Sequence, residues 1–401
     1  MDQGMGMAKR YLEMSETRGW RDSDATVCAD CLTDGALVAA VVEYGGTQMC
    51  TFCEGLPTVG SAPLDLVVGL VVDGFRSEYE DPIEQAAYDS EDGYLVPMHD
   101  TEDLLIEFDI SDRSDVISAV DAAISQDVWC QRDPYALTPS QALVWGWDAF
   151  RKYVKSVRRY TFLVHDPSTA DGAGALAMHS VPEAIATAVV DAGLVKTLPA
   201  GTRWWRARVD ANGQRFSSAA QIGTPPVAYA QDNRMSPKGI GAFYGASTRE
   251  GAVKEVAGYA DADAMLSLGE FELNRPVRVV DLREAPELPS LFDVDRRYLR
   301  APVTFLQSFI ENVRAPSPPD DKQNLEYVPT QVITEHLRYE IHDPAGPIEG
   351  IIWRSSKDPD VDVCVLFFEN ATFADSGSAS MDTRMVLDGA SVVHREVGRQ
   401  E

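Results

Sequence analysis

Apolar residues in the first half of the chain recur mainly at the spacing of an α-helix. In 140–157, SQALVWGWDAFRKYVKSV, they return every three or four positions, and Ser140 stands where a helix cap is expected. The runs DLVVGLVV at 65–72 and DVISAVDAAI at 115–124 favour helices in the same way. These patterns predict a mainly helical region from about 60 to 165.

The second half alternates helical patterns with short apolar runs that are typical of strands. The small, polar and glycine-rich stretch 166–180 separates the halves and predicts a domain boundary. Helices are expected at 181–195 and 330–341, and strands at 277–282, 350–356 and 363–368. This mixture predicts an α+β domain over 181–401.

Charge and composition narrow the class of protein. The 401 residues include 35 Lys and Arg against 63 Asp and Glu, a formal charge of −28. This balance disfavours nucleic acid as a general partner, because phosphate binding needs clustered cations. The longest apolar run is flanked by Asp65 and Asp73, and the first residues carry no signal-peptide pattern, so no membrane or export segment is expected.

Four of the six cysteines form two close pairs. Cys28 and Cys31 are separated from Cys50 and Cys53 by 18 residues, the C-x₂-C…C-x₂-C spacing of a structural zinc site. Four thiolates leave no open coordination position, so the expected Zn²⁺ is structural. The alternative is free thiols or a redox pair, although a redox site needs only one C-x-x-C. Low cysteine use in a long chain favours a reducing cytoplasm.

A small basic segment interrupts the acidic chain at 201–250. It holds seven basic and three acidic side chains, and it includes the glycine-rich stretch RMSPKGIGAFYGAS at 234–247. Arginines suit the bidentate binding of phosphate, so the segment predicts a pocket for an anionic small molecule. The plainer alternative is surface arginines paired with the abundant carboxylates. Ser247 and Glu250 have the spacing of a capping box, which predicts that a helix begins there.

Four blocks of this half resemble the RES-domain family, which is named for its Arg, Glu and Ser. They are WRAR at 205–208, NRMSPKGIGAFYGAS at 233–247, the helix that carries Glu255, and IIWRSSKDPDVDVCVLFFEN at 351–370, in the family's order. The preceding region resembles the HEPN-associated N-terminal domain fused to some RES domains. The resemblance implies a fold related to ADP-ribosyltransferases and the cleavage of the nicotinamide–ribose bond of NAD⁺, with water or phosphate as acceptor.

The resemblance also implies roles for single residues. Arg206, Tyr244, Glu255 and Ser355 are the expected catalytic residues, with Ser356 as the other candidate for the family serine. Substrate-binding roles are implied for Arg208, Arg234, Ser356 and Asn370. Arg234 departs from the pattern, because relatives often have Gly-Arg-Trp where this chain has Asn-Arg-Met.

The chemistry of N-glycosidic cleavage fits these residue types. Positive charge develops on the ribose as the bond breaks, and a nearby carboxylate such as Glu255 stabilises it. Arginines would hold the pyrophosphate, and Tyr244 would stack on the face of the nicotinamide or ribose. Ser355 would fix the geometry of the site through a hydrogen bond. From the helical period alone, Glu255 points about 160° away from the apolar stripe of its helix, which is also the position of an ordinary solvated glutamate.

Two other activities stay open. Arg159 and His165 have the R-x₄₋₆-H spacing of HEPN ribonucleases, although the YTFLV between them reads as a strand or buried run. Transfer of ADP-ribose to a macromolecule is the other alternative.

The predicted architecture is thus a Cys₄ zinc module at 1–60, a HEPN-like helical region at 61–180, and an ADP-ribosyltransferase-like α+β RES domain at 181–401. By analogy with the family we expect a cytoplasmic toxin or phage-defence effector that depletes NAD⁺. Expected partners are an antitoxin or regulator on the N-terminal region and further copies of the chain.

Overall fold

The computed structural model describes residues 17–162, 174–210, 214–257, 260–261, 263–316, 325–341 and 345–398. The chain divides into two compact units. The first holds the described residues up to Thr138 together with Gly174 and Leu288–Arg300, and the second holds the other described residues from Pro139 onward. Among the described residues, no helix is both long enough and apolar enough to cross a bilayer.

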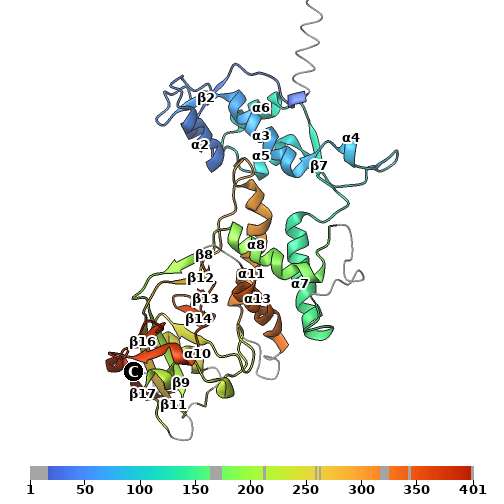
Figure 1. The fold of residues 1–401 in the computed structure, drawn as a ribbon. Coiled ribbons are helices and arrows are strands. Elements are labelled where there is room, and N and C mark those ends of the chain that lie inside the picture. Colours follow the sequence, from blue (N-terminus) through green and yellow to red (C-terminus); the bar gives the residue numbers. More distant parts are fainter. Residues whose placement is uncertain are drawn as a thin grey trace, which may run out of the picture. The chain divides into compact units, whose positions relative to one another are not determined.

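The first unit is built mainly of helices with small sheets at their ends (Figure 1). Its helices are α2 (Gly35–Tyr44), α3 (Leu64–Glu78), α4 (Pro82–Gln85), α5 (Thr101–Glu107) and α6 (Ser114–Ala123). Its strand pairs and sheet are β1 (Thr26–Cys28) with β2 (Ser61–Pro63), β4 (Tyr88–Asp89) with β5 (Gly93–Tyr94), and β3 (Tyr79–Glu80), β7 (Val128–Gln131) and β6 (Met98–Asp100). The helices expected at 65–72 and 115–124 are therefore confirmed by α3 and α6.

One hydrophobic core joins the elements of the first unit. Helix α3 buries Val67, Val71 and Phe75, and the Phe75 ring lies edge-on to Trp129 with centroids 5.6 Å apart. Cys28 and Cys50 belong to this same core. The cysteine-bearing segment thus shares its core with the helices that follow the predicted boundary at residue 60. So short a segment buries too little surface to form a core of its own.

The second unit is organised around a ten-stranded mixed sheet (Figure 1). Along the sheet the order is β15 (Phe373–Asp375), β16 (Met385–Leu387), β11 (Met265–Leu273), β9 (Arg203–Val209), β10 (Phe243–Ala246), β14 (Asp362–Leu366), β13 (Gly350–Arg354), β12 (Val277–Leu282) and β8 (Val195–Leu198), with β17 (Val393–Glu396) also paired to β11. The strands expected at 277–282, 350–356 and 363–368 are confirmed.

Alternate side chains of these strands enter two separate cores, as the two-residue period of a strand requires. Val280, Ile351 and Val363 face one core, whereas Val279 and Ile352 face the other. Helices cover the first of these faces, namely α7 (Pro139–Ser156), α8 (Val181–Asp191), α11 (Arg300–Arg314) and α13 (Val328–Tyr339). The expected α+β class, with helices and a large mixed sheet, is confirmed at this level.

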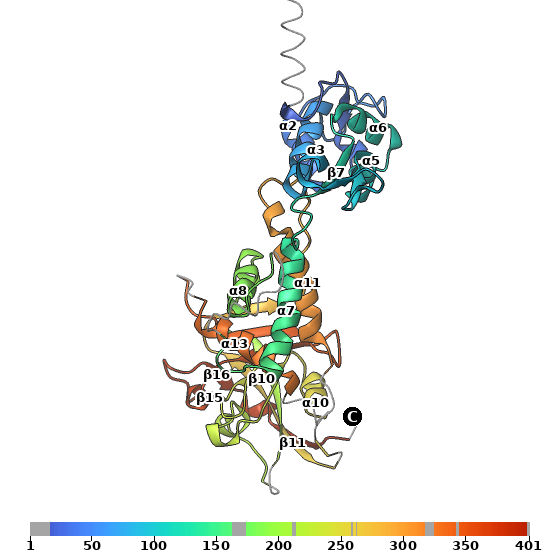
Figure 2. The ribbon, with the colours of Figure 1, turned by 90° about the vertical axis from the view of Figure 1, so that its right-hand side faces the viewer.

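Helix α7 belongs to this second unit and not to the first. Figure 2 shows it beside α11, and Arg151 Nη1 on α7 donates a hydrogen bond of 3.0 Å to Asn312 Oδ1 on α11. The rings of Trp147 and Phe309 meet edge-on at 5.3 Å. The apolar face of α7, read from the sequence as part of an N-terminal helical region, is therefore buried against the helical layer that covers the large sheet.

The sheet opens between β9 and β10. These two strands pair only at Ala246 with Trp205, whereas β9 pairs with β11 along its whole length. Helix α10 (Arg249–Ala257) follows β10 directly. Its capping oxygen is that of Thr248, which accepts from Gly251 N at 3.0 Å, one residue later than the expected Ser247. Ser247 Oγ instead accepts from Asp362 N at 3.0 Å.

Candidate functional site

A pocket of about 500 Å³ lies where β9 and β10 diverge. That volume is within the usual range for small-molecule sites. The wall comes from β9, β10, α10, the loop 225–241, one residue of β13 and two of β14. Four of the sequence-predicted site residues line it: Arg206, Arg208, Tyr244 and Glu255.

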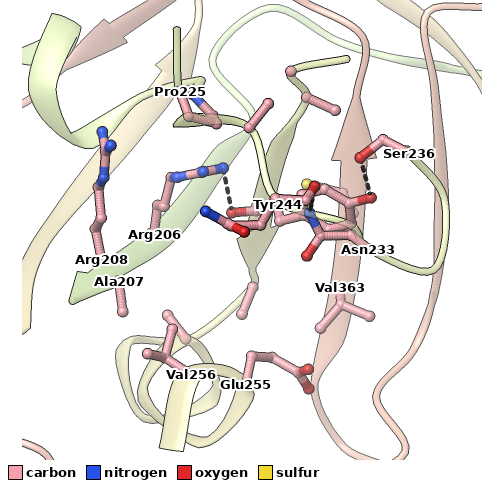
Figure 3. A pocket seen from close by; sticks show the side chains of 18 of the residues that line it. Arg206, Ala207, Arg208, Pro225, Asn233, Ser236, Tyr244, Glu255, Val256 and Val363 are labelled. Atoms are coloured by element: carbon pink, nitrogen blue, oxygen red, sulfur yellow. Dashed lines mark hydrogen bonds between the residues drawn. The ribbon is translucent and has the colours of Figure 1, made fainter. Parts of the chain in front are cut away.

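The two arginines leave β9 on one side of the strand (Figure 3). Arg206 Nη1 donates to the carbonyl oxygen of Tyr244 at 3.1 Å, which links the two diverging strands, and its guanidinium lies 5.1 Å from the Phe243 ring centroid. Arg208 donates to the Gln221 carbonyl oxygen and lies over the Phe216 ring. Backbone and rings thus fix both guanidinium groups at the pocket wall, where an anion can reach them.

Tyr244 is held by a hydrogen bond at its hydroxyl end. Its OH and Ser236 Oγ are 2.9 Å apart (Figure 3), and Ser236 is itself buried. Burial raises the pKa of Tyr244 far above the usual range of a phenol. The side chain is therefore a neutral, oriented aromatic group in the pocket.

Glu255 is joined to Ser355, which is 100 positions later in the sequence. Ser355 Oγ donates to Glu255 Oε1 at 2.5 Å, and the same Oγ accepts from the backbone N of Lys357 at 3.1 Å. Ser355 is only 5% exposed, whereas the Glu255 side chain is 38% exposed and lines the pocket. One carboxylate oxygen is thus fixed by the serine, while the carboxylate stays open to a ligand.

Lys357 ties the end of α10 to this group. Its Nζ donates to the carbonyl oxygens of Lys254 at 2.8 Å and Glu255 at 2.7 Å, and it lies 4.0 Å from Glu255 Oε2. Burial lowers the pKa of Lys357, while the Glu255 carboxylate acts in the opposite direction. A cation at a helix C-terminus stabilises the last carbonyl groups, so Lys357 fixes the turn of α10 that carries Glu255.

Three other residues predicted for the site lie elsewhere. Arg234 donates to carbonyl oxygens at the end of α11, those of Asn312, Val313 and Ala315, at 3.3, 3.1 and 2.7 Å. Ser356 is exposed and does not line the pocket.

Asn370 is the third of these residues. Its Nδ2 donates to the carbonyl oxygens of Ala220 and Thr224 at 2.8 and 2.5 Å, which fixes the loop that precedes Pro225 of the pocket wall. Arg234 and Asn370 therefore hold backbone segments in place in this structure.

Sequence reasoning missed several residues that shape the pocket. Ser236 lies inside the quoted block 233–247, but nothing in its neighbours marks it as the partner of Tyr244. No local pattern marks Asp210, which lines the pocket, or Lys357, which contacts the end of a helix 102 positions earlier in the sequence. Arg159 is exposed just after α7, and His165, its partner in the predicted ribonuclease motif, lies outside the described residues.

The four paired cysteines of the first unit form a second candidate site. Their Sγ atoms all lie within 4.8 Å of one another, and the closest pairs are 3.5, 3.7 and 3.8 Å apart. A tetrahedral Zn–S₄ centre with bonds of about 2.3 Å has S–S edges of about 3.8 Å. None of the four is in a disulfide, so the cluster can hold a metal ion.

Polar contacts hold the segments that carry these cysteines. Ser111 Oγ donates to the Cys31 carbonyl oxygen at 2.7 Å, and Arg113 Nη2 donates to that of Phe52 at 2.8 Å. Burial raises the pKa of Cys28 to about 11 when no cation is present. A bound divalent cation reverses this effect, because it stabilises the thiolates.

The chain was compared with known proteins. Residues 203–388 match the family model of the RES domain, and residues 43–168 match HEPN/RES N-terminal domain 1. No curated protein matches the chain. All the residues that line the pocket lie within the RES-domain match. The match to the N-terminal domain covers Cys50 and Cys53 but begins after Cys28 and Cys31.

Proposed function

We propose that this chain, which carries a RES domain behind a HEPN/RES N-terminal domain, cleaves the nicotinamide–ribose bond of NAD⁺ with phosphate or water as acceptor. The observation that carries the proposal is the hydrogen bond between Ser355 and Glu255 at the pocket. It joins two of the three residue types for which the family is named, and Arg206, of the third type, lines the same pocket as Glu255. The large mixed sheet, opened between β9 and β10, is the part we propose to be ADP-ribosyltransferase-like.

Glu255 is the proposed stabiliser of the transition state. As the bond to nicotinamide breaks, positive charge develops on the ribose, and a carboxylate nearby lowers the energy of that state more than it lowers the ground state. Ser355 donates to Oε1, and Oε2, with Lys357 Nζ 4.0 Å away, is the oxygen that faces the ribose in this proposal. Because nicotinamide leaves as a neutral molecule from a cationic substrate, no general acid is required.

The other pocket residues bind and orient the substrate in this proposal. Arg206 and Arg208 hold the pyrophosphate through charge-assisted hydrogen bonds. Tyr244, neutral and fixed by Ser236, presents its ring to the nicotinamide or ribose. Together they place the scissile bond against Glu255, which is the orienting contribution to catalysis.

Zn²⁺ is the metal we propose for the cysteine cluster. When bound it supplies folding energy to the first unit and takes no part in the chemistry, because four thiolates leave it no open position. The first unit would then serve as a site for an antitoxin or regulator. That assignment rests on the family resemblance and on the pocket wall, whose residues all come from the second unit.

Incubation of the full-length protein with NAD⁺, with and without phosphate, tests the proposal. We expect free nicotinamide, with ADP-ribose as the second product in water and ADP-ribose 1″-phosphate when phosphate is the acceptor, both resolved by mass spectrometry. ADP-ribose found attached to protein in the same spectra would instead indicate transfer to a macromolecule. Intact NAD⁺ after long incubation with folded wild-type protein would contradict the proposal.

A further inference from the structure

A hydrogen-bonded group at one end of the pocket has no part in the function proposed so far. Ser267 Oγ donates to Asp210 Oδ1, lies 2.9 Å from His394 Nδ1, and accepts from Phe216 N at 3.0 Å. Ser267 is fully buried on β11, and Asp210 lines the pocket just beyond the end of β9. His394 lies on β17, directly opposite Ser267.

The proton positions in this group follow from its geometry. A serine hydroxyl has one hydrogen, and Ser267 gives it to the Asp210 carboxylate. Its oxygen must therefore accept from both Phe216 N and His394 Nδ1, so His394 carries a proton on Nδ1. The serine is held by two donors and in turn holds one oxygen of Asp210. Ser267 and His394 are thus positioning residues for that carboxylate.

The other oxygen of Asp210 differs from the first. Among the residues that the structure describes, Oδ2 of Asp210 is buried and makes no hydrogen bond. A buried carboxylate oxygen without a donor is costly, because it has lost its water and gained nothing in return. Because the residue lines the pocket, a ligand hydroxyl can supply the donor that the protein does not.

Asp210 also continues the line of the two pocket arginines. Arg206, Arg208 and Asp210 are spaced two residues apart, so they share one side of the chain and follow one another at about 6.6–6.8 Å. Ser267 pairs with Arg208 across the sheet and bonds to Asp210, which places Asp210 on that same side. Along this line two cations are followed by an anion.

We propose that Asp210 is a specificity residue that accepts hydrogen bonds from the hydroxyls of the second ribose, the one attached to adenine, and rejects a phosphate on that sugar. This rests on the proposed function. With the scissile ribose at Glu255 and the pyrophosphate at the arginines, the next unit of an extended dinucleotide is that ribose. A carboxylate accepts from hydroxyl groups but repels a 2′-phosphate, so the pocket selects NAD⁺ over NADP⁺.

Arg208 does not reverse this selection. Its guanidinium is held by the Gln221 carbonyl oxygen and the Phe216 ring and, in the proposed function, binds the pyrophosphate. Asp210 is therefore the charged group that meets whatever lies beyond the pyrophosphate.

Steady-state cleavage of NAD⁺ and NADP⁺ by full-length wild type, Asp210→Asn and Asp210→Glu tests this inference. Asp210→Asn should lower the NAD⁺:NADP⁺ ratio of kcat/KM by about tenfold or more, through KM, because an amide accepts more weakly and carries no charge. Asp210→Glu keeps the charge and should keep the rejection of NADP⁺ while it raises KM for NAD⁺. Asp382→Asn, an exposed carboxylate of the same unit, is the matched control.

Binding of both dinucleotides to Glu255→Gln, with and without Asp210→Asn, separates this inference from the proposed function. Calorimetry on these variants measures dinucleotide preference without any chemistry. Suppose that wild type cleaves neither dinucleotide, that Glu255→Gln binds NAD⁺ more tightly than NADP⁺, and that adding Asp210→Asn removes this preference. The proposed reaction then fails and the specificity role stands. If folded Asp210→Asn leaves both the kinetic and the binding ratios unchanged, the specificity role is overturned.

Discussion

The cysteine cluster and the split-sheet pocket are built in opposite ways. The four thiols come from 26 consecutive residues and turn inward on one another, and three of the four are buried. The pocket draws Arg206 and Tyr244 from two strands and Glu255 from a helix, and the carboxylate of Glu255 is held by Ser355 from a fourth segment but stays open. A closed local cluster can stabilise a fold but cannot admit a substrate, whereas an open site of distant residues can bind and react.

Removal of a cysteine ligand should produce the largest effect and confine it to the first unit. Cys28→Ser should abolish tight metal binding and unfold this unit, because structural zinc contributes about 10–16 kcal/mol of apparent binding energy in small zinc-finger peptides. Metal analysis and thermal unfolding measure this, with wild type expected to hold one zinc. Cys130→Ser is the control, since Cys130 is buried in the same unit outside the cluster. Equal losses in both variants would contradict a metal role.

Glu255→Gln should produce the largest effect on catalysis. If the carboxylate stabilises charge that exists mainly in the transition state, kcat and kcat/KM should fall together by about 10²-fold or more, with little change in thermal stability. Nicotinamide release measures the rate. Glu250→Gln, an exposed glutamate in the first turn of the same helix, should stay near wild type. A Glu255→Gln protein with normal turnover would show that Glu255 is only a solvated side chain.

The two sites also differ in how far the sequence alone could predict them. The C-x₂-C pairs predicted the cysteine cluster because a short spacing fixes which thiols meet. The helices at 115–124 and 140–157 were readable because their apolar stripes have a clear period, whereas β9, RWWRARV, and β11, with Gly269 and Glu270 inside it, show no regular alternation of apolar and polar residues.

The rest of the pocket depends on tertiary packing. No local pattern indicates that Ser355 donates to Glu255 rather than closing a turn, or that Arg234 binds the end of α11. The family resemblance drew attention to these residues, but their partners follow from strand order and from the opening between β9 and β10. Asp210 and Ser267 likewise meet only because β9 pairs with β11.

Arg206→Ala should weaken substrate binding. Loss of a charge-assisted hydrogen bond, about 1.5–3 kcal/mol, corresponds to a rise in KM for NAD⁺ of about 10- to 150-fold, with a smaller change in kcat. Arg203→Ala is the control, because Arg203 lies on the same strand but is exposed and paired with Glu270 and Glu272. A larger effect on kcat than on KM would instead place Arg206 at the reacting centre.

Arg234→Ala should affect stability more than activity. The side chain is largely buried and holds carbonyl oxygens at the end of α11, so its loss should lower the free energy of unfolding by about 1–3 kcal/mol. KM for NAD⁺, measured on the folded fraction at low temperature, should stay within about twofold. A strong rise in KM without loss of stability would return Arg234 to the substrate-binding role that the family resemblance implies.

Ser355→Ala should have the smallest effect of these substitutions, and it decides how the open site is held. Without Ser355 Oγ the carboxylate of Glu255 loses its fixed oxygen but keeps its charge, so kcat should fall by about five- to tenfold, the equivalent of one hydrogen bond of about 1 kcal/mol, while KM changes little. Ser356→Ala is the matched control, because Ser356 is the exposed neighbour and the other candidate for the family serine. A reversal, with Ser356→Ala slower than Ser355→Ala, would mean that the bond between Ser355 and Glu255 is not what orients the carboxylate during turnover.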